Sequence, residues 1–431
     1  MRSVKLASVL ATVAIIAGAC SSAATQAPAS QAAPASAAPA ASVAAPASQA
    51  AAPSVPAASV ASSGLTGTLT IWEAYGASGT SELPAFKQMV QNVMTANPGL
   101  TVNILDVPFG QLFNKFETEA AAGGGPDLYI APNDNLPSEA RAGLLKDVSD
   151  QLATLKAAPY SESDTALNAA TVDGKLYEIP ESMKAVELMY NTSMITTPPV
   201  TTDDWKADAS KLGWVYGANG GGAYYLWGLF GAFGGKIMDD TGKCIADQGG
   251  VADALKWLQQ MKAAGMHFYQ NDGDAKAAMI AGKIAGFIEG PWQSADLSKA
   301  LGSKLSVIAG PKGPAGDWAP LTAPDGYYIN ASSSNADLAV KFALAMLQPS
   351  NEQLFADFGH LPANTTIQPK DPVAQSFASL MASGYPRPTL KELNNYWGNF
   401  GNALAAVVDK GTDPVAAVKT ACDAMNKANN K

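Results

Sequence analysis

The sequence predicts an α/β protein built on largely parallel sheets, and two observations carry this prediction. Short segments rich in β-branched residues alternate with segments whose apolar residues recur at helical spacing. Strands joined through helices pair in parallel by right-handed crossovers. The chain also has 431 residues, 47% of them hydrophobic, which is enough for two or three domains with their own cores.

The elements follow in order from Gly64, where the globular part begins. Residues 67–75 (GTLTIWEAY) predict a strand, and a helix follows in which Phe86, Met89, Val90 and Val93 share one face. After it come a turn and a second strand (97–108), a helix stopped by glycines (112–125) and a third strand (126–132). Further amphipathic helices are expected at 250–266 and 334–348, where they would cover the sheets.

Polar side chains follow the predicted first and third strands. Glu73 and Tyr75 come at the end of the first strand, and Asp134 and Asn135 follow the third. Ligands of parallel sheets bind outside the carboxyl ends of the strands. These four residues are therefore candidates for a binding site.

The N-terminus predicts export. Arg2 and Lys5 precede an apolar stretch (6–16) that is too short for a comfortable membrane span, and small residues lead to Cys20. This order resembles the lipobox of bacterial lipoproteins, so residues 1–20 are interpreted as a lipoprotein signal peptide and Cys20 as the lipidated residue. Ordinary cleavage nearby, with Cys20 incidental, is the alternative.

Residues 21–63 predict a disordered tether. They consist almost wholly of Ala, Pro, Ser, Gln and Val, so they cannot bury enough apolar surface to offset the entropy of ordering. Such a segment would span about 35 Å as a flexible coil and up to about 130 Å as extended polyproline II. A tether of this length suits a domain that works at a distance from its lipid anchor.

Charge and composition narrow the classes of ligand. The net charge is -9, which argues against nucleic acid, because its binders concentrate Lys and Arg on one face. Charged residues are scarce and aromatic residues are plentiful, so a ligand held by neutral hydrogen bonds and ring faces is favoured. Cys244 and Cys422 could pair, but we favour two separate buried thiols. His267 and His360 stand far from both cysteines, and we expect no metal and no cofactor.

A series of motifs then gives a resemblance that covers about residues 65–431. The motifs are TLTIW, GPDLYIAPND, AGLLKDVS, TVDGKLYEIP, LMYNTSM, AAMIAGKIAGFIEGPW, PDGYYINASS and GHLPAN. In this order and spacing the chain resembles the extracellular solute-binding proteins of ABC importers, in the branch typified by the maltose-binding protein.

The resemblance implies a two-lobed periplasmic-binding-protein fold (Venus flytrap), with an α/β sheet in each lobe and the ligand between the lobes. The N-terminal lobe would hold residues 65–180 and 320–365, and the C-terminal lobe residues 181–319 and 366–431. Hinge crossovers would join the lobes. The local sequence is compatible, since 176–191 could carry the first crossing and Gly- and Pro-rich passages precede the other two.

The resemblance also implies a carbohydrate site. A sugar ring needs aromatic faces for stacking and polar groups for its hydroxyls. The tryptophan of GPW stacks on the sugar in this family, which gives Trp292, and two further stacking positions fall on Tyr224 and Trp397. The polar positions map onto Asp134 and Asn135.

Three departures separate this chain from the maltose-binding pattern. Lys184 stands where that pattern has a glutamate in its hinge segment, and Ala131 stands where it has an aromatic residue. Residues around Gly76 replace an Asp-Lys pair. We therefore expect a sugar or oligosaccharide, maltose/maltodextrin-like or related, and do not single out maltose. Lys184 belongs to the candidate site, and for Glu73, Tyr75 and Asp325 binding and structural roles are equally favoured.

The function implied is capture of a sugar or oligosaccharide and its delivery to the transmembrane permease subunits of an ABC transporter with a cytoplasmic ATPase. The protein would be a monomer, lipid-anchored at the outer face of the cytoplasmic membrane, in a periplasm or at a cell surface. No catalytic residue is expected. The alternatives are a ferric-ion binder using Tyr224–Tyr225 and Tyr327–Tyr328, and a secreted glycoside hydrolase with two carboxylates.

Overall fold

The computed structural model describes residues 63–76, 82–217 and 221–431. All of them belong to one compact unit, 56–431. The predicted signal peptide, Cys20 and nearly all of the predicted tether lie outside the described residues. Within the described part, no helix has both the length and the apolar character that a membrane crossing requires.

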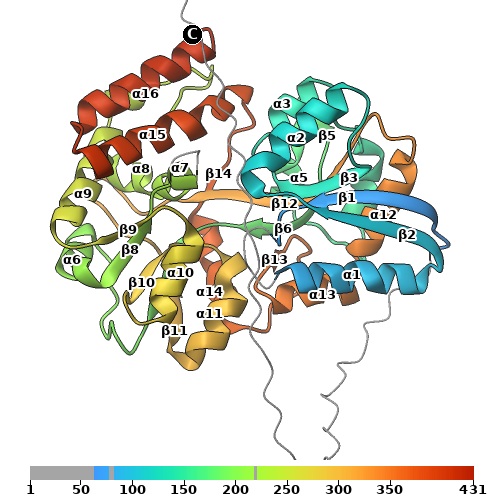
Figure 1. The fold of residues 1–431 in the computed structure, drawn as a ribbon, viewed down its shortest axis with the longest axis horizontal. Coiled ribbons are helices and arrows are strands. Elements are labelled where there is room, and N and C mark those ends of the chain that lie inside the picture. Colours follow the sequence, from blue (N-terminus) through green and yellow to red (C-terminus); the bar gives the residue numbers. More distant parts are fainter. Residues whose placement is uncertain (1–62, 77–81, 218–220) are drawn as a thin grey trace, which may run out of the picture. The chain divides into compact units, whose positions relative to one another are not determined.

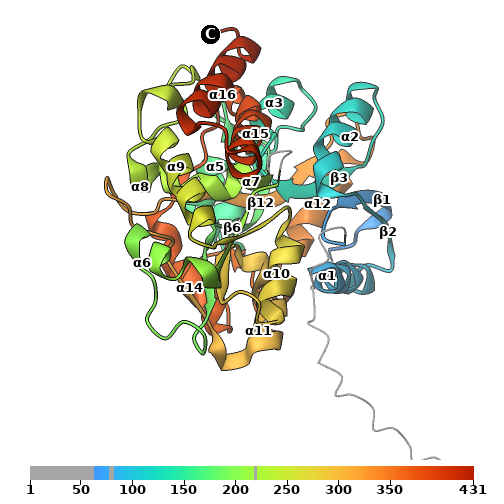
Figure 2. The same ribbon diagram turned by 60° about the vertical axis from the view of Figure 1, so that its left-hand side comes forward.

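The first sheet contains seven strands in the order β13-β6-β12-β3-β1-β2, with β14 beside β12. They are β1 (Thr66–Glu73), β2 (Gly99–Asp106), β3 (Leu128–Pro132), β6 (Ile179–Lys184), β12 (Leu321–Ile329), β13 (Leu361–Pro362) and β14 (Tyr385–Pro386). The helices near this sheet in sequence are α1 (Glu82–Ala96), α2 (Phe109–Ala121), α3 (Leu136–Arg141), α4 (Leu152–Lys156), α5 (Asp164–Ala169), α12 (Ala336–Met346) and α13 (Pro349–Asp357). In both views α1 lies on one side of β1 and α2 on the other (Figures 1 and 2).

The second sheet contains five strands in the order β11-β7-β10-β8-β9. They are β7 (Glu187–Asn191), β8 (Leu212–Val215), β9 (His267–Tyr269), β10 (Gly286–Glu289) and β11 (Leu305–Ile308); a separate hairpin pairs β4 (Thr171–Val172) with β5 (Lys175–Leu176). The remaining helices are α6 (Thr202–Ala207), α7 (Gly221–Leu226), α8 (Gly228–Phe233), α9 (Val251–Ala263), α10 (Asp272–Ile280), α11 (Ser294–Leu301), α14 (Pro372–Leu380), α15 (Asn394–Lys410) and α16 (Pro414–Ala428).

The α/β fold agrees with the sequence prediction, but the expectation of mostly parallel sheets needs correction. β1 pairs in parallel with β2 and β3, whereas β12 runs antiparallel to both β3 and β6. The second sheet is mixed in the same way. A parallel neighbour requires a crossover on the face of its own sheet. β12 instead arrives from β11 of the other sheet, so no crossover helix fixes its direction.

Three segments carry the chain between the two sheets. Residues 185–186 join β6 to β7, residues 309–320 join β11 to β12, and residues 363–371 lead from β13 to α14. Two of the expected lobe boundaries fall in these segments, whereas the one at 180/181 falls inside β6; the boundaries stay a prediction.

The buried apolar side chains form separate clusters that follow the two sheets. One large cluster surrounds the second sheet, and two smaller clusters cover opposite faces of the first. Tyr327 belongs to one of the smaller clusters and Tyr328 to the other, because successive side chains of β12 point to opposite faces. These two phenols therefore cannot bind one ferric ion together.

Cys244 and Cys422 form a disulfide, so the expectation of two separate thiols is wrong. Their Cα atoms lie 5.4 Å apart although 178 residues separate them in the sequence. Asn426, one helical turn after Cys422 on α16, accepts a hydrogen bond from the backbone N–H of Cys244 (2.7 Å) and donates one to its carbonyl (3.2 Å). Only the folded chain brings these partners together.

Removing the disulfide is expected to lower the free energy of unfolding by about 2–5 kcal/mol, because a long loop gains entropy in the unfolded chain. The variant carries Cys244→Ser and Cys422→Ser, and urea unfolding measures the change. Wild-type protein unfolded with a reductant present should match the variant. An unchanged urea midpoint in the double variant would contradict the disulfide.

Candidate functional site

Strand register brings three of the predicted residues to one edge of the first sheet. Asp325 on β12 lies opposite Pro132 at the end of β3, two residues before Asp134, and Lys184 on β6 lies opposite Ala323. The Lys184 ammonium donates to the Asp325 carboxylate, and both side chains are mostly buried. A buried charge requires a partner of this kind.

Arg387 adds a second buried ion pair at the same edge. It follows β14, and its backbone N–H donates to the carbonyl of Thr322 (3.0 Å). Its Nη1 donates to the carboxylate of Asp134 and to Oδ1 of Asn133 (2.9 Å). Only 4% of Arg387 is exposed. The two cations and two carboxylates balance, so the site as a whole carries no net charge from these four groups.

Three aromatic side chains lie against these ion pairs. Trp292 lies in the single turn η4 (Pro291–Gln293) after β10, and Tyr224 and Trp397 lie on α7 and α15. The centroids of Tyr224 and Trp292 are 6.3 Å apart, with the rings tilted by 44°. All three rings are partly buried and pack against the core of the second sheet.

Cations lie near all three rings. The Lys184 Nζ is 5.7 Å from the Trp292 ring centroid, and the Arg387 Cζ is 5.7 Å from that of Tyr224 and 5.2 Å from that of Trp397. We call this group the ring and charge cluster; its members are Trp292, Tyr224, Trp397, Lys184, Asp325, Arg387 and Asp134.

The electrostatics of Tyr224 agree with the closeness of these members. Burial raises the pKa of the Tyr224 phenol well above its ordinary value, Arg387 opposes this shift, and Asp325 and Asp134 add to it. Tyr224 is therefore neutral at physiological pH and keeps its proton for hydrogen bonding. A phenol that keeps its proton is unsuited to bind ferric ion, which takes tyrosine as the phenolate.

Gly290 explains how Trp292 is held at its turn. A Cβ atom on Gly290 would lie 2.0 Å from the indole, so the ring is folded back over the glycine. The Glu289 carboxylate fixes the turn, because it accepts from the Gly290 N–H (2.7 Å) and from the Tyr225 hydroxyl (3.2 Å). Gly359, at φ +105°, approaches the turn from the other side, where a Cβ would lie 2.5 Å from the Pro291 carbonyl oxygen.

Trp397 is placed by its neighbour on α15. Tyr396 is fully buried, and its hydroxyl donates to the carbonyl of Ala223 on α7 (2.8 Å). The Trp397 ring packs edge-on against the ring of Tyr396, with the two centroids 5.0 Å apart. The hydrogen bond from Tyr396 ties α15 to α7, which carries Tyr224.

The remaining predicted residues make other contacts. The Glu73 carboxylate accepts from the backbone N–H of Tyr75 (2.6 Å), and burial raises its pKa. The Tyr75 ring packs against Phe86 and Phe355, with centroids 5.3 and 5.5 Å away. The Asn135 side chain donates to Glu117 on α2 (2.7 Å). These contacts fit structural roles. The pKa of the Tyr75 phenol is raised by burial and also by nearby carboxylates, among them Asp325 of the ring and charge cluster.

His360 lies in a buried polar group beside Tyr75. Its Nε2 lies 2.7 Å from Glu82, and its Nδ1 lies 3.1 Å from Glu181 and 3.3 Å from the Ser182 hydroxyl. Burial lowers the pKa of His360, but Glu181 and Glu82 outweigh burial and raise it to about 10. A histidine that stays protonated at neutral pH cannot act as the base for Ser182, so this arrangement is no hydrolase triad.

Arg387 and Asn133 were not among the residues that the sequence singled out. Arg387 is one of only three arginines in the chain, between two prolines, and this rarity is a signal that sequence reasoning could have used. Asn133 stands directly before Asp134 and carries no signal of its own. Its role depends on Arg387, which lies more than 250 residues away.

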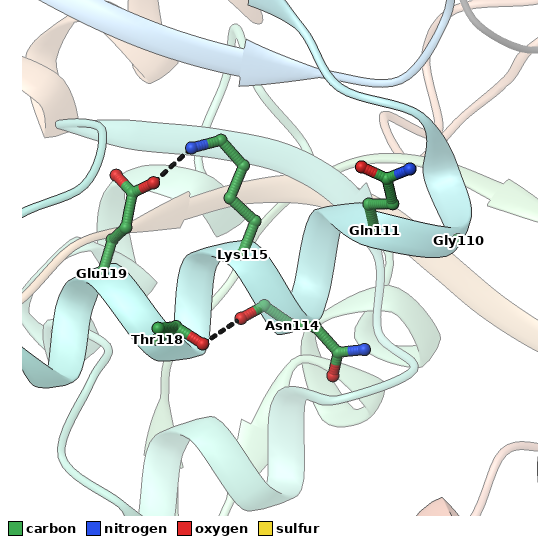
Figure 3. A pocket seen from close by; sticks show the side chains of 6 residues that line it. All are labelled: Gly110, Gln111, Asn114, Lys115, Thr118 and Glu119. Carbon is green, nitrogen blue, oxygen red and sulfur yellow. Dashed lines mark hydrogen bonds and ion pairs between the residues drawn. The ribbon is translucent and has the colours of Figure 1, made fainter. Parts of the chain in front are cut away.

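A shallow depression on α2 lies outside the cluster (Figure 3). Only residues of α2 line it: Gly110, Gln111, Asn114, Lys115, Thr118 and Glu119. Lys115 and Glu119 are paired with each other, and the Thr118 hydroxyl donates to the carbonyl of Asn114 (2.7 Å). A single helix face with its charges paired offers no converging groups for a ligand.

Comparison with known proteins identifies the family. The model of the family described as bacterial extracellular solute-binding protein matches residues 88–382. The chain is 25% identical over 351 residues to a galactooligosaccharide-binding protein of Bacillus subtilis, covering 75% of this chain and 81% of that one. It is 22% identical over 334 residues to a maltooligosaccharide ABC transporter solute-binding lipoprotein of Streptococcus pneumoniae, covering 72% and 77%.

The fold is that of solved members with two lobes. The maltotriose-binding protein of Thermus thermophilus, solved with maltotriose bound, matches with a TM-score of 0.73 and 25% identity. The match covers 84% of this chain and all of that one. The sequence prediction of the family and of the two-lobed α/β fold is confirmed.

Gly290→Ala is expected to lower the free energy of unfolding by about 1–3 kcal/mol, because the new methyl group collides with the Trp292 indole. Gly398→Ala is the matched control. Gly398 stands next to Trp397 in α15, and a Cβ there meets nothing within 4 Å, so this change should stabilise by about 0.5–1 kcal/mol. Urea unfolding of both variants measures the changes; a Gly290→Ala variant as stable as the wild type would show that the indole does not lie over Gly290.

Proposed function

This chain belongs to the bacterial extracellular solute-binding protein family, and we propose that it captures a neutral sugar or oligosaccharide at the ring and charge cluster for an ABC importer. The observation that carries the proposal is the convergence of Trp292, Tyr224 and Trp397 on two charge-balanced ion pairs. A sugar presents an apolar C–H face and hydroxylated edges. The cluster offers ring faces to the C–H face and polar groups to the hydroxyls.

The charge balance favours a neutral ligand. Lys184 and Arg387 are both paired, with Asp325 and Asp134, so neither cation is left for a ligand's carboxylate or phosphate. An anionic ligand would have to displace a buried carboxylate, which would then lose its own partner. The relatives named above bind oligosaccharides, which supports the same class of ligand.

The mechanism is capture without a chemical step. Asp134, Lys184 and Asp325 come from the first sheet, whereas Tyr224 and Trp292 pack on the core of the second. A sugar that contacts the polar residues of the first sheet and the rings at the second sheet stabilises the closed arrangement of the two sheets. A sugar that contacts only one of these sets would not. The three segments that join the sheets would act as the hinge.

Delivery to a membrane permease follows from the family and from the N-terminal sequence. We propose that Cys20 is lipidated, that residues 21–63 tether the binding domain, and that the protein works as a monomer at the outer face of the cytoplasmic membrane. The pneumococcal relative is named an ABC transporter lipoprotein, which supports this placement. The partners would be the permease subunits and their cytoplasmic ATPase.

Thermal unfolding with a panel of maltotriose, a galactooligosaccharide, glucose and ferric citrate tests the ligand class. We expect at least one oligosaccharide to raise the unfolding temperature, because a ligand that binds only the folded state stabilises it. Calorimetry on the best sugar should show that Trp292→Ala weakens binding more than tenfold.

Phe109→Ala is the control, since Phe109 is an aromatic residue on α2 that is 46% exposed and lies outside the cluster. Its affinity should equal that of the wild type. Stabilisation by ferric citrate alone, or unchanged sugar binding in Trp292→Ala, would contradict the proposed function.

A further inference from the structure

Three hydrogen-bonding atoms of the ring and charge cluster are buried without a partner among the described residues. They are Nε of Arg387, Nε1 of Trp397 and the hydroxyl of Tyr224. Buried polar atoms are nearly always hydrogen-bonded, and an unpaired one costs about 1–3 kcal/mol. Three such atoms on neighbouring side chains point to a group that completes their hydrogen bonds.

The guanidinium of Arg387 is fixed in place by its other contacts. Nη1 is bound by Asp134 and Asn133, the backbone is bound to Thr322, and the guanidinium lies near the rings of both Tyr224 and Trp397. The free Nε–H therefore has a set direction before any ligand arrives. A donor that is held in advance loses little entropy when it binds.

The chemistry of these atoms defines the group that fits them. An arginine Nε–H and an indole N–H can only donate, so the ligand must present acceptor oxygens to them. The charge of Arg387 is already balanced by Asp134, and Asp325 also lies near Tyr224. The fitting acceptors are neutral hydroxyl or ring oxygens, because an anion would face two carboxylates.

We infer that Arg387 is a specificity-determining residue of the sugar site, whose Nε–H binds a ligand oxygen together with the Trp397 indole N–H and the Tyr224 hydroxyl. This inference rests on the proposed function and adds which protein groups would bind the hydroxylated edge of the sugar. A sugar that lacks the matching hydroxyl leaves these donors unpaired and is rejected. The stacking rings alone would not make that distinction.

Nitrogen NMR on the full chain labelled with ¹⁵N-arginine tests the inference directly. The chain has only Arg2, Arg141 and Arg387, so its Nε–H spectrum is simple, and Arg387→Lys and Arg141→Lys assign the signals. The probe is the sugar of the panel above that stabilises the protein most, with maltotriose tried first. The Arg387 signal should shift and exchange more slowly with solvent when the sugar binds.

Arg141 is the internal control. Its Nε already donates to Asp173 (2.9 Å), so its signal should stay in place. Calorimetry gives the second readout: Arg387→Lys keeps the charge but loses the planar donor and should weaken binding about 10- to 100-fold. Phe109→Ala, which lies outside the cluster, should bind as the wild type does.

The outcomes separate the two proposals. If a sugar binds the wild type and the Arg387 signal does not move, the inference about Arg387 is wrong and the proposed function stands. If no sugar of the panel binds, both fall. Because the NMR measurement compares free and sugar-bound wild-type protein, a folding defect in Arg387→Lys leaves its outcome unchanged.

Discussion

The buried ion pair between Arg387 and Asp134 holds together the cluster that we propose as the sugar site. It joins the segment before α15 to the end of β3, and two further hydrogen bonds support it, from Arg141 to the Thr389 carbonyl and from Asn394 to the Ser138 hydroxyl. A buried guanidinium without its carboxylate would be strongly destabilising. The pair therefore fixes where Arg387 lies relative to the rings of Tyr224 and Trp397.

The rings acquire their role from this charge balance. Aromatic side chains alone would form one more part of an apolar core, as Trp205 on α6 and Trp214 on β8 do beside the second sheet. Beside paired charges, the same kind of side chain borders a site that is polar and yet neutral. The position of the Trp292 ring depends on Gly290, because a residue without a side chain leaves room for the indole to fold over the backbone.

Local patterns predicted much of this from the sequence. The first three strands and the helices between them follow from periodicity, whereas the three rings were expected from the resemblance to the family. What the sequence left open depends on contacts across long separations: the partner of Arg387, the bond between Cys244 and Cys422, and the antiparallel direction of β12. Glu73 and Tyr75 follow a strand end as expected. The Glu73 carboxylate nevertheless accepts from the Tyr75 N–H, and the Tyr75 ring packs on Phe86, because a position at a strand end does not determine the partners of a side chain.

A crystal structure of the protein with its best-binding oligosaccharide, soaked in or co-crystallised, would show whether the sugar lies at the ring and charge cluster. We expect a sugar ring whose C–H face lies within about 4 Å of the Trp292 indole and whose oxygens accept hydrogen bonds from Arg387 Nε and Trp397 Nε1. Sugar density on another surface, with the Arg387 and Trp397 donors still unpaired, would contradict it.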